Sequence, residues 1–268
     1  MSATQPLFGF LFALVVAVLA YRAHSLSRSG AWAATVVGTL IFGLGGWRWA
    51  VLLLTFFISS SALSHAFATR KHGLSEKFAK GSQRDWGQVF GNGAVAAFFS
   101  LLHSFYPQAT WPWVAFAASL AAVNADTWAT ELGVLSPSDP HLITDLRKRV
   151  DKGTSGGISP IGSLAALGGA ALIGLLAGTL SPTPAPAKTA LFVTLSGFAG
   201  ALFDSFLGAT VQAIYLCPTC AKETERHPTH LCGAQTALLR GWRWLNNDWV
   251  NFACAAFGAG MALLLFAL

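Results

Sequence analysis

Charged residues are scarce in this chain, since Asp, Glu, Lys and Arg make up only 10% of its 268 residues. Soluble globular domains carry about 25% charged residues. Hydrophobic residues make up 54% of the chain and gather in long runs, which excludes an ordinary soluble protein and predicts a polytopic membrane protein. The net charge of +6 does not indicate a nucleic-acid partner, because the basic residues lie in short segments between the apolar runs.

Four other features are missing. No basic residue precedes the first apolar run, residues 7–20, so the positive region of a secretory signal is absent and we expect a retained first span. No long Pro- or Ser-rich linker and no convincing repeat is present, which predicts one integral membrane domain over residues 1–268. The Gly-rich segment 153–157 lacks the spacing of a Walker motif.

The apolar runs predict an all-α, polytopic transmembrane helix bundle of about eight spans, within a range of about seven to nine. The expected spans lie at roughly residues 6–22, 30–45, 47–66, 87–105, 112–133, 158–180, 189–216 and 248–267.

The basic residues predict the orientation of these spans. Fifteen of the 17 fall in four segments that an eight-span order puts on one side: 22–28, 70–84, 147–152 and 222–243. The positive-inside bias places that side in the cytoplasm and both termini outside, in the cell or plasma membrane. Cytoplasmic loops are then expected at about 67–86, 134–157 and 217–247.

Carboxylates inside the apolar runs are the first candidate site residues. Asp126 and Glu131 lie near the cytoplasmic end of the fifth span, and Asp204 lies in the seventh. A charge at the middle of a membrane costs roughly 2.5–3.5 kcal/mol on insertion scales and usually serves function. Such oxygen ligands suit Mg²⁺ shared with phosphate, so these three residues predict a magnesium site. Hydrogen bonding between helices is the alternative.

The helical geometry separates two of these acids. Five residues at 100° each place Asp126 and Glu131 roughly 140° apart, so they flank a cleft unless the helix unwinds near residues 125–127. We expect Asp126 to face Asp204, and Glu131 to lie nearer the turn at residues 153–157.

Basic and amide side chains at the same end are candidates for binding phosphate. The basic run 147–152 leads into a Gly-Thr-Ser-Gly-Gly turn and then a helix, whose N-terminal amides favour anions. An ordinary interfacial turn is the alternative. In the segment 70–84, topology and lipid headgroups explain most basic residues, and Arg84 stands apart because it leads into Asp85. Lys152 joins the three acids as a catalytic candidate. The candidates for substrate or phosphate binding are Arg84, Gln88, Asn92, Asn124, Thr127, Arg149, Thr154, Ser155, Gly156, Gly157, Ser205, Asp248 and Asn251.

Three of the four cysteines lie in one loop. Cys217 and Cys220, followed by His230 and Cys232, offer four soft ligands and predict a structural, tetrahedral zinc site. Unliganded thiols are the alternative, and disulfides are disfavoured on the reducing side of the membrane. Cys254 is expected to be a packing residue.

Several motifs follow one another in an order that resembles a known family. They are Arg84-Asp-Trp-Gly-Gln88, Asn124-Ala-Asp-Thr-Trp-Ala-Thr-Glu131, Gly153-Thr-Ser-Gly-Gly157, Leu202-Phe-Asp-Ser205, Cys217 to Cys232 and Asn247-Asp248 with Asn251. Over about residues 30–260 the chain resembles the integral membrane family that includes transmembrane protein 19 and the plastid phytyl-phosphate kinase.

The resemblance implies a kinase that converts a prenyl, phytyl-like monophosphate to the diphosphate, and the carboxylates and basic Gly/Ser turns add the expectation that it depends on Mg²⁺. The donor would be a nucleoside triphosphate, CTP or ATP, and the partners would be the bilayer, the lipid phosphate and the nucleotide. A CTP-dependent nucleotidyl transferase would need the same parts. An ion-coupled transporter or flippase of a phosphorylated lipid is the alternative from another class, and a zinc-dependent structural membrane protein is a third.

Overall fold

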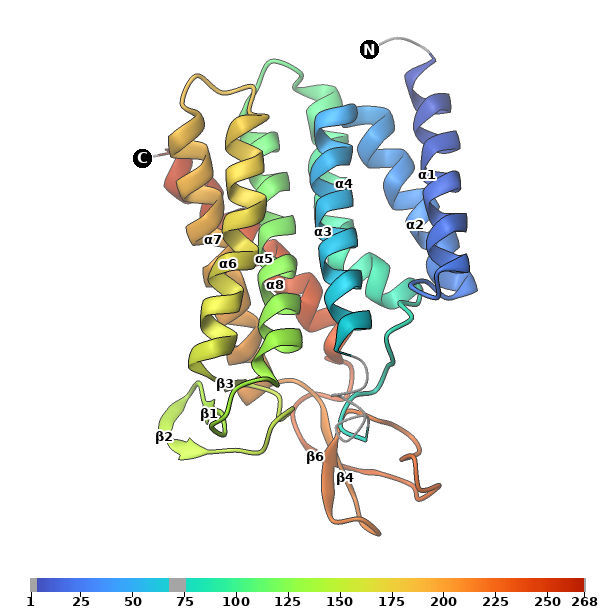
Figure 1. The fold of residues 1–268 in the computed structure, drawn as a ribbon, viewed down its shortest axis with the longest axis vertical. Coiled ribbons are helices and arrows are strands. Elements are labelled where there is room, and N and C mark those ends of the chain that lie inside the picture. The colour runs from blue at the N-terminus through green and yellow to red at the C-terminus, as the bar shows by residue number, and fades with distance from the viewer. Residues whose placement is uncertain (1–3, 68–75, 268) are drawn as a thin grey trace.

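The computed structural model describes residues 4–67 and 76–267, and over these residues the chain folds into a bundle of eight α-helices (Figure 1). The helices are α1 (Gln5–Arg22), α2 (Arg28–Leu40), α3 (Trp47–Ala66), α4 (Trp86–Phe105), α5 (Trp111–Gly133), α6 (Pro160–Thr179), α7 (Pro186–Thr210) and α8 (Asn247–Ala267), with a π-helical turn η1 (Ile41–Gly45) after α2. The seventh helix ends earlier than the sequence predicted, because Ile214–Cys217 forms a strand instead.

The surface of the bundle is that of a membrane protein. Large apolar side chains such as Phe8, Leu164 and Leu264 are more than half exposed on the outside of the helices. Within the described residues, α1, α3, α6, α7 and α8 are each long and apolar enough to cross a bilayer. The fuller count of eight spans, and the placement of both termini outside, stay predictions.

Successive helices run in opposite directions, so the connections alternate between two ends of the bundle (Figure 1). The two ends of the chain lie at one end of the bundle, and the strand-bearing segments lie at the other. The basic segments predicted to share one side also lie at the strand-bearing end, although Arg70 and Lys71 of the second segment lie outside the described residues.

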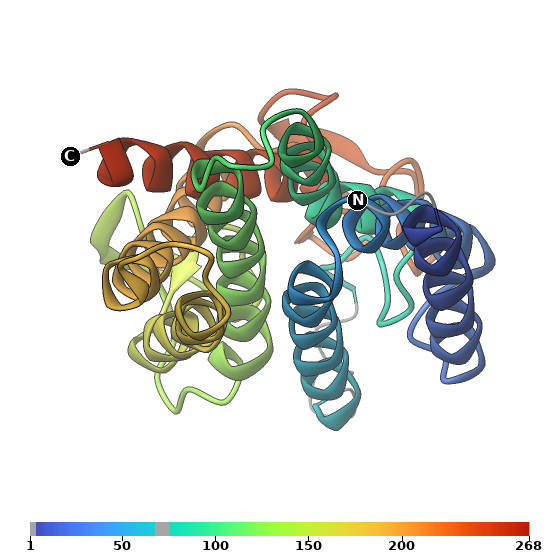
Figure 2. The same cartoon turned by 90° about the horizontal axis from the view of Figure 1, so that it is seen from above.

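Helix α5 is the centre of the bundle. Its residues from Pro112 to Ala125 are all buried, and it packs against α6, α7 and α8 on one side and α3 and α4 on the other (Figure 2). Small residues permit this close packing. A Cβ on Gly197 or Gly200 of α7 would lie only 2.5 Å from the Cβ atoms of Ala121 or Ala122.

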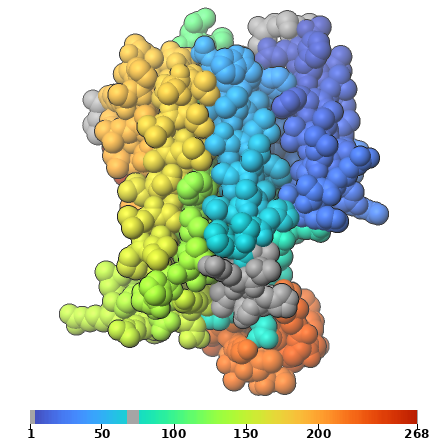
Figure 3. Space-filling model, viewed as in Figure 1, coloured from blue at the N-terminus to red at the C-terminus, as the bar shows by residue number. Residues whose placement is uncertain are grey.

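The description all-α needs a correction, because two small antiparallel sheets form in the predicted loops. The first contains β1 (His141–Leu142), β2 (Asp145–Arg149) and β3 (Gly157–Ile158) in the order β2-β1-β3. The second contains β4 (Ile214–Cys217), β5 (Lys222–Thr224) and β6 (Ala237–Arg240) in the order β5-β4-β6. These strands have two to five residues, too few for an apolar period to show in the sequence. Figure 3 shows the segments that carry them protruding below the helices.

Candidate functional site

Two carboxyl groups meet inside the helical bundle. Asp126 on α5 and Asp204 on α7 share a side-chain hydrogen bond, and both residues are half-buried. The Oδ2 atom of Asp204 is buried without a hydrogen-bond partner in the part of the chain that the structure describes. Two carboxyl groups can approach so closely only when they share a proton or a cation. The prediction that Asp126 faces Asp204 is confirmed, and α5 stays regular through residues 125–127.

Two further acids extend this pair toward the strand-bearing end. Glu225, just after β5, lies within electrostatic reach of Asp204 and of Asp248 at the start of α8. Its Oε1 accepts hydrogen bonds from Ser155 at 3.1 Å and Gln212 at 2.9 Å. We call Asp126, Asp204, Glu225 and Asp248 the carboxylate cluster.

Lys80 forms salt bridges to both the carboxylate cluster and the start of α4. The ammonium of Lys80 contacts Asp248 and lies 2.9 Å from Asp85, the residue that caps α4. Burial opposes the charge of Lys80, but the bonds to Asp248 and Asp85 outweigh it and raise the pKa of the ammonium. A charged lysine therefore stands at the edge of the cluster at neutral pH.

The half-buried carboxyl group of Glu225 predicts a dependence of stability on pH. Burial raises the pKa of Glu225 above its ordinary 4.5, and hydrogen bonds from Ala79, Ser155 and Gln212 only partly oppose this. The folded protein therefore holds this proton more tightly than the unfolded chain, so the group's contribution is greatest at low pH and falls as pH rises through the raised pKa. We expect Glu225→Gln to flatten the decline in melting temperature above about pH 4.5. Thermal unfolding in detergent measures this, with exposed Glu223→Gln as the control, and equal slopes in wild type and Glu225→Gln would refute it.

Arg84 forms a second part of the site. Its backbone is fixed, because its N–H donates to the carbonyl of Ser25 and its carbonyl accepts from the N–H of Ser27, each at 3.0 Å. Its guanidinium lies 5.4 and 5.6 Å from the ring centres of Phe56 and Phe57. Burial lowers the pKa of Arg84 to about 10, although the nearby Glu131 carboxylate opposes the shift. Arg84 is thus a charged group with mainly apolar surroundings, a suitable anchor for an anion.

The structure corrects the expected position of Glu131. This residue is buried and accepts a hydrogen bond of 2.7 Å from Ser64 on α3, on the side of the bundle that carries Arg84. The carboxylate that contacts the turn at residues 153–157 is Glu225, through Ser155. The sequence missed this because the loop that carries Glu225 folds back over the turn only in the tertiary structure.

Two predicted basic residues make no contact with the carboxylate cluster. Lys152 donates to the carbonyls of Val134 and Ser136, just after the end of α5. Arg149 is exposed on β2. The sheet β2-β1-β3 accounts for both, because it folds the basic run beside the chain that leaves α5. Their predicted roles at phosphate are not supported by this arrangement.

The Gly-rich turn packs against α7. A Cβ on Gly156 would lie 2.5 Å from the Cβ of Ala209, and its φ of +86° is in the region that favours glycine. Thr154 accepts a bond of 3.5 Å from Lys77, and Gly157 belongs to β3. The turn therefore brings Ser155 to the cluster.

Several predicted polar residues stabilise the helices instead of facing the site. The Oδ1 atom of Asn124 accepts bonds from Ser59 and Ser60, and its Nδ2 donates to the carbonyl of Gly169, so its amide joins three helices. Thr127 bonds to a carbonyl of its own helix.

The other predicted residues lie near the two parts of the site. Gln88 forms a capping box with Asp85, and Asn92 donates to the carbonyl of Gln88. Ser205 follows Asp204 on α7, and Asn251 is buried about one turn after Asp248 on α8.

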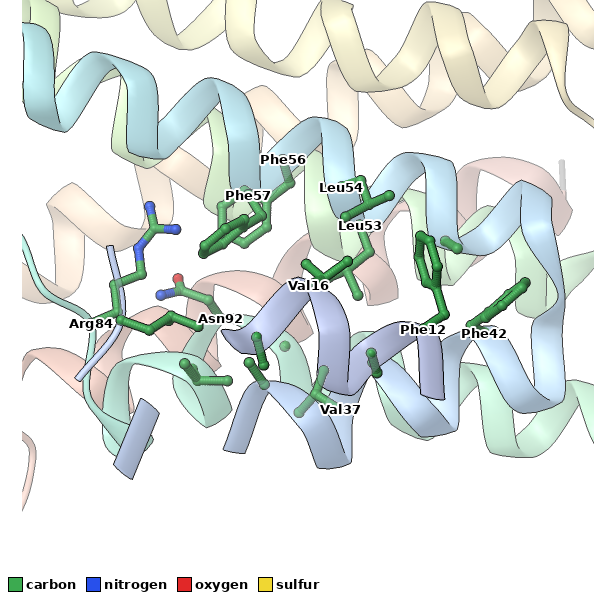
Figure 4. Close-up of a pocket in the computed structure, with 18 of the residues that line it drawn as sticks. Phe12, Val16, Val37, Phe42, Leu53, Leu54, Phe56, Phe57, Arg84 and Asn92 are labelled. Carbon is green, nitrogen blue, oxygen red and sulfur yellow. The ribbon is translucent and has the colours of Figure 1, made fainter. Parts of the chain in front are cut away.

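An apolar groove runs from Arg84 along the helices. It lies between α1, α2, α3 and α4 and holds about 750 Å³ of space, its open side included. Its charged and amide side chains are Arg84, Gln88 and Asn92, and Figure 4 shows Arg84 and Asn92 at one end and Phe12 and Phe42 at the other. The groove suits an elongated apolar molecule with an anionic end.

The sequence did not identify two central residues, Glu225 and Lys80. Glu225 lies in a run with Glu223 and two basic residues, and nothing in the sequence separates the two acids. Lys80 was assigned to topology and headgroup contact, whereas the structure pairs it with Asp85 and Asp248. The one available signal was the capping acid Asp85 five residues after Lys80.

Fold and site together define a polytopic membrane protein with a polar, charged site at one end of its helices. The chain belongs to the family described as integral membrane protein DUF92, whose model matches residues 11–259. This confirms the family resemblance drawn from the motifs.

Three similar proteins match most of the chain. It is 33% identical to Protein PGR of Arabidopsis thaliana over 93% of each chain. It is 34% identical to the uncharacterized membrane protein MJ0933 of Methanocaldococcus jannaschii over 76% of this chain and 83% of that one. It is 29% identical to Protein VTE6, chloroplastic, of Arabidopsis thaliana over 90% of this chain and 65% of that one. No solved structure matches the chain.

Proposed function

We propose that this protein is a membrane-embedded, Mg²⁺-dependent kinase that phosphorylates a prenyl monophosphate to the diphosphate with a nucleoside triphosphate. The observation that carries the proposal is the apolar groove with Arg84 at its polar end, in a bundle that also carries the carboxylate cluster. Similarity to Protein VTE6 and the resemblance to the plastid phytyl-phosphate kinase support a prenyl phosphate as acceptor.

The groove and Arg84 provide the acceptor site in this proposal. The groove lies between four helices and is lined mainly by apolar side chains with a few polar groups, as sites for apolar ligands usually are. The prenyl chain lies between α1 and α3, and Arg84 holds the phosphate through charge-assisted hydrogen bonds. Ser61, which already accepts a bond from Arg84 at 3.4 Å, fixes the guanidinium.

The carboxylate cluster provides the donor site. Its oxygens form a hard donor set that fits Mg²⁺, and the unpartnered Oδ2 of Asp204 is a free ligand position among the described residues. Bound Mg²⁺ would neutralise the oxygens of the transferred phosphoryl group. Asp126, Asp204 and Glu225 would hold the ion, and Lys80 and Lys77 would add positive charge for the phosphates. Lys77, Thr154 and Ser155 also line a small hollow beside Glu225.

The positive-inside distribution of charge supports a cytoplasmic position for both sites, where nucleotide is available. The proposed sites lie at the strand-bearing end, and the basic residues predicted for the opposite side are only Arg48 and Lys188. This one-sided arrangement favours an enzyme over a transporter, which needs access from both faces.

Purified protein with Mg²⁺, ATP or CTP, and a panel of prenyl monophosphates tests the proposal. We expect the diphosphate from at least one acceptor and none after chelation of Mg²⁺. A nucleotide–lipid product would indicate nucleotidyl transfer instead. Folded protein that forms no product, but moves a prenyl phosphate into proteoliposomes without nucleotide, would establish the transporter.

Filling the groove should weaken acceptor binding selectively. Val16 lines the groove, whereas its neighbour Val15 is 57% exposed on the outer face of α1. We expect Val16→Trp to raise KM for the prenyl phosphate roughly tenfold or more, the loss of about 1.4 kcal/mol of apolar contact, with little change in KM for the nucleotide. Val15→Trp adds the same bulk outside the groove and should leave both constants unchanged. Equal effects of the two variants would place the acceptor elsewhere.

A further inference from the structure

Three cysteines and one histidine from the second sheet and the loops between its strands come together outside the helical bundle. Cys217 ends β4, Cys220 lies in the turn before β5, and His230 and Cys232 lie in the loop between β5 and β6. Their ligand atoms all lie within 4.8 Å of one another. Cys217 and His230 are buried, so the cluster belongs to the packed part of this region and is not formed by exposed side chains alone.

The distances inside the cluster match a tetrahedral zinc site. With Zn–S of about 2.3 Å and Zn–N of about 2.0–2.1 Å, a tetrahedron has S···S edges of about 3.8 Å and S···N edges of about 3.6 Å. The Sγ atoms of Cys217 and Cys232 lie 3.6 Å apart. The Nδ1 atom of His230 lies 3.7 Å from Sγ of Cys220 and 3.2 Å from Sγ of Cys232. A disulfide is excluded here, because its sulfurs would lie about 2.05 Å apart.

The backbone around the cysteines is shaped to hold a metal. Ala221 and Gly233, the residues after Cys220 and Cys232, have φ angles of 51° and 85°. A positive φ lets the chain turn sharply just after Cys220 and just after Cys232. For Ala221, which is not a glycine, this conformation is strained and needs a compensating interaction.

We propose that Cys217, Cys220, His230 and Cys232 bind one structural Zn²⁺ ion. Three thiolates and one imidazole complete a four-coordinate shell with no open position, so the ion stabilises the fold and does not activate water. The zinc joins the β4–β5 turn to the loop after β5, two segments that are otherwise connected mainly by short strands.

This site also has a consequence for the carboxylate cluster. Thr224 ends β5 and Glu225 follows it, and Thr224 donates to the carbonyl of Glu76 at 2.6 Å. Zinc at one end of β5 therefore positions Glu225 at the other end. Only this consequence rests on the proposed function, whereas metal binding itself does not.

The metal content of the full-length protein tests the proposal. We expect mass spectrometry to find about one zinc per chain in the wild type, and a large loss in Cys217→Ser and Cys220→Ser. Cys254→Ser changes a buried cysteine in α8, apart from the site, and should retain the zinc. Replacing the metal by Co²⁺ should produce the thiolate-to-cobalt charge-transfer and tetrahedral d–d absorption bands.

The wild-type measurements decide the matter even if a variant fails to fold. Chelation should lower the melting temperature and Zn²⁺ should restore it, whether or not the protein shows kinase activity. Wild-type protein that carries no zinc, and that gives no tetrahedral spectrum with Co²⁺, would overturn the proposal. A Cys217–Cys232 disulfide in protein kept under reducing conditions would overturn it as well.

Discussion

Asp126→Asn is expected to lower kcat for phosphoryl transfer on the order of 10²–10³-fold, the usual loss when one fixed electrostatic contact to a transition state is removed. Asp126 meets Asp204 inside the bundle, where its charge is needed to hold Mg²⁺ against the phosphates. The amide keeps the size of the side chain and can still hydrogen-bond to Asp204. The melting temperature should therefore remain close to that of the wild type, or rise as the repulsion between the two acids is relieved.

Asp139→Asn provides the matched control, because Asp139 is exposed in the segment after α5. It makes the same chemical change outside the cluster and should leave kcat unaltered. The assay compares initial rates at saturating nucleotide and acceptor for folded preparations of both variants. An Asp126→Asn enzyme within a few-fold of wild type would remove Asp126 from the proposed donor site.

Arg84→Gln is expected to raise KM for the prenyl phosphate by about 10- to 150-fold, corresponding to the roughly 1.5–3 kcal/mol that a hydrogen bond to a charged group contributes. The change should leave the fold intact, because the contacts that anchor this segment use the backbone of Arg84. Since burial lowers the pKa of Arg84 to about 10, the charged guanidinium costs stability below that pH. The variant should therefore unfold at the same temperature as the wild type or higher.

A loss of acceptor affinity without a loss of stability distinguishes binding from structural support. Arg147→Gln on the exposed strand β2 is the control and should change neither KM nor melting temperature. Arg84→Lys should recover part of the affinity, because lysine restores the charge but not the planar pair of donors. If Arg84→Gln lowered the melting temperature and left KM unchanged, Arg84 would not be the proposed anion-binding end of the groove.

The helices and the acid pair could be predicted because their signals are local. Runs of apolar residues predicted α3 at residues 47–66, and the structure has Trp47–Ala66. Asp126 and Asp204 stood out because a carboxylate within an apolar run is costly and therefore informative. The spacing of Cys217, Cys220, His230 and Cys232 predicted a cluster, and the structure brings these four side chains together.

The loop contacts could not be predicted in the same way. Lys80 meets Asp248 across 168 positions, and Glu225 meets Ser155 across 70. Polar residues in a loop carry no period, so only the folded chain shows which of them turn toward the cluster. The same limit explains why the sequence favours Arg149 and Lys152, the more conspicuous basic residues, over Lys80.

By itself the sequence determined that this is a helical membrane protein of the DUF92 family with carboxylates in its spans, because apolar length, buried charge and motif order are properties of the chain alone. Only the tertiary structure decided which side chains share a site. In the structure, Asn124 links helices through hydrogen bonds, Glu131 lies near Arg84, and Glu225 lies near Asp204. The orientation of each helix about its axis, and the way the loops fold back against the bundle, determine these partners. Both depend on packing between segments that are distant in the sequence.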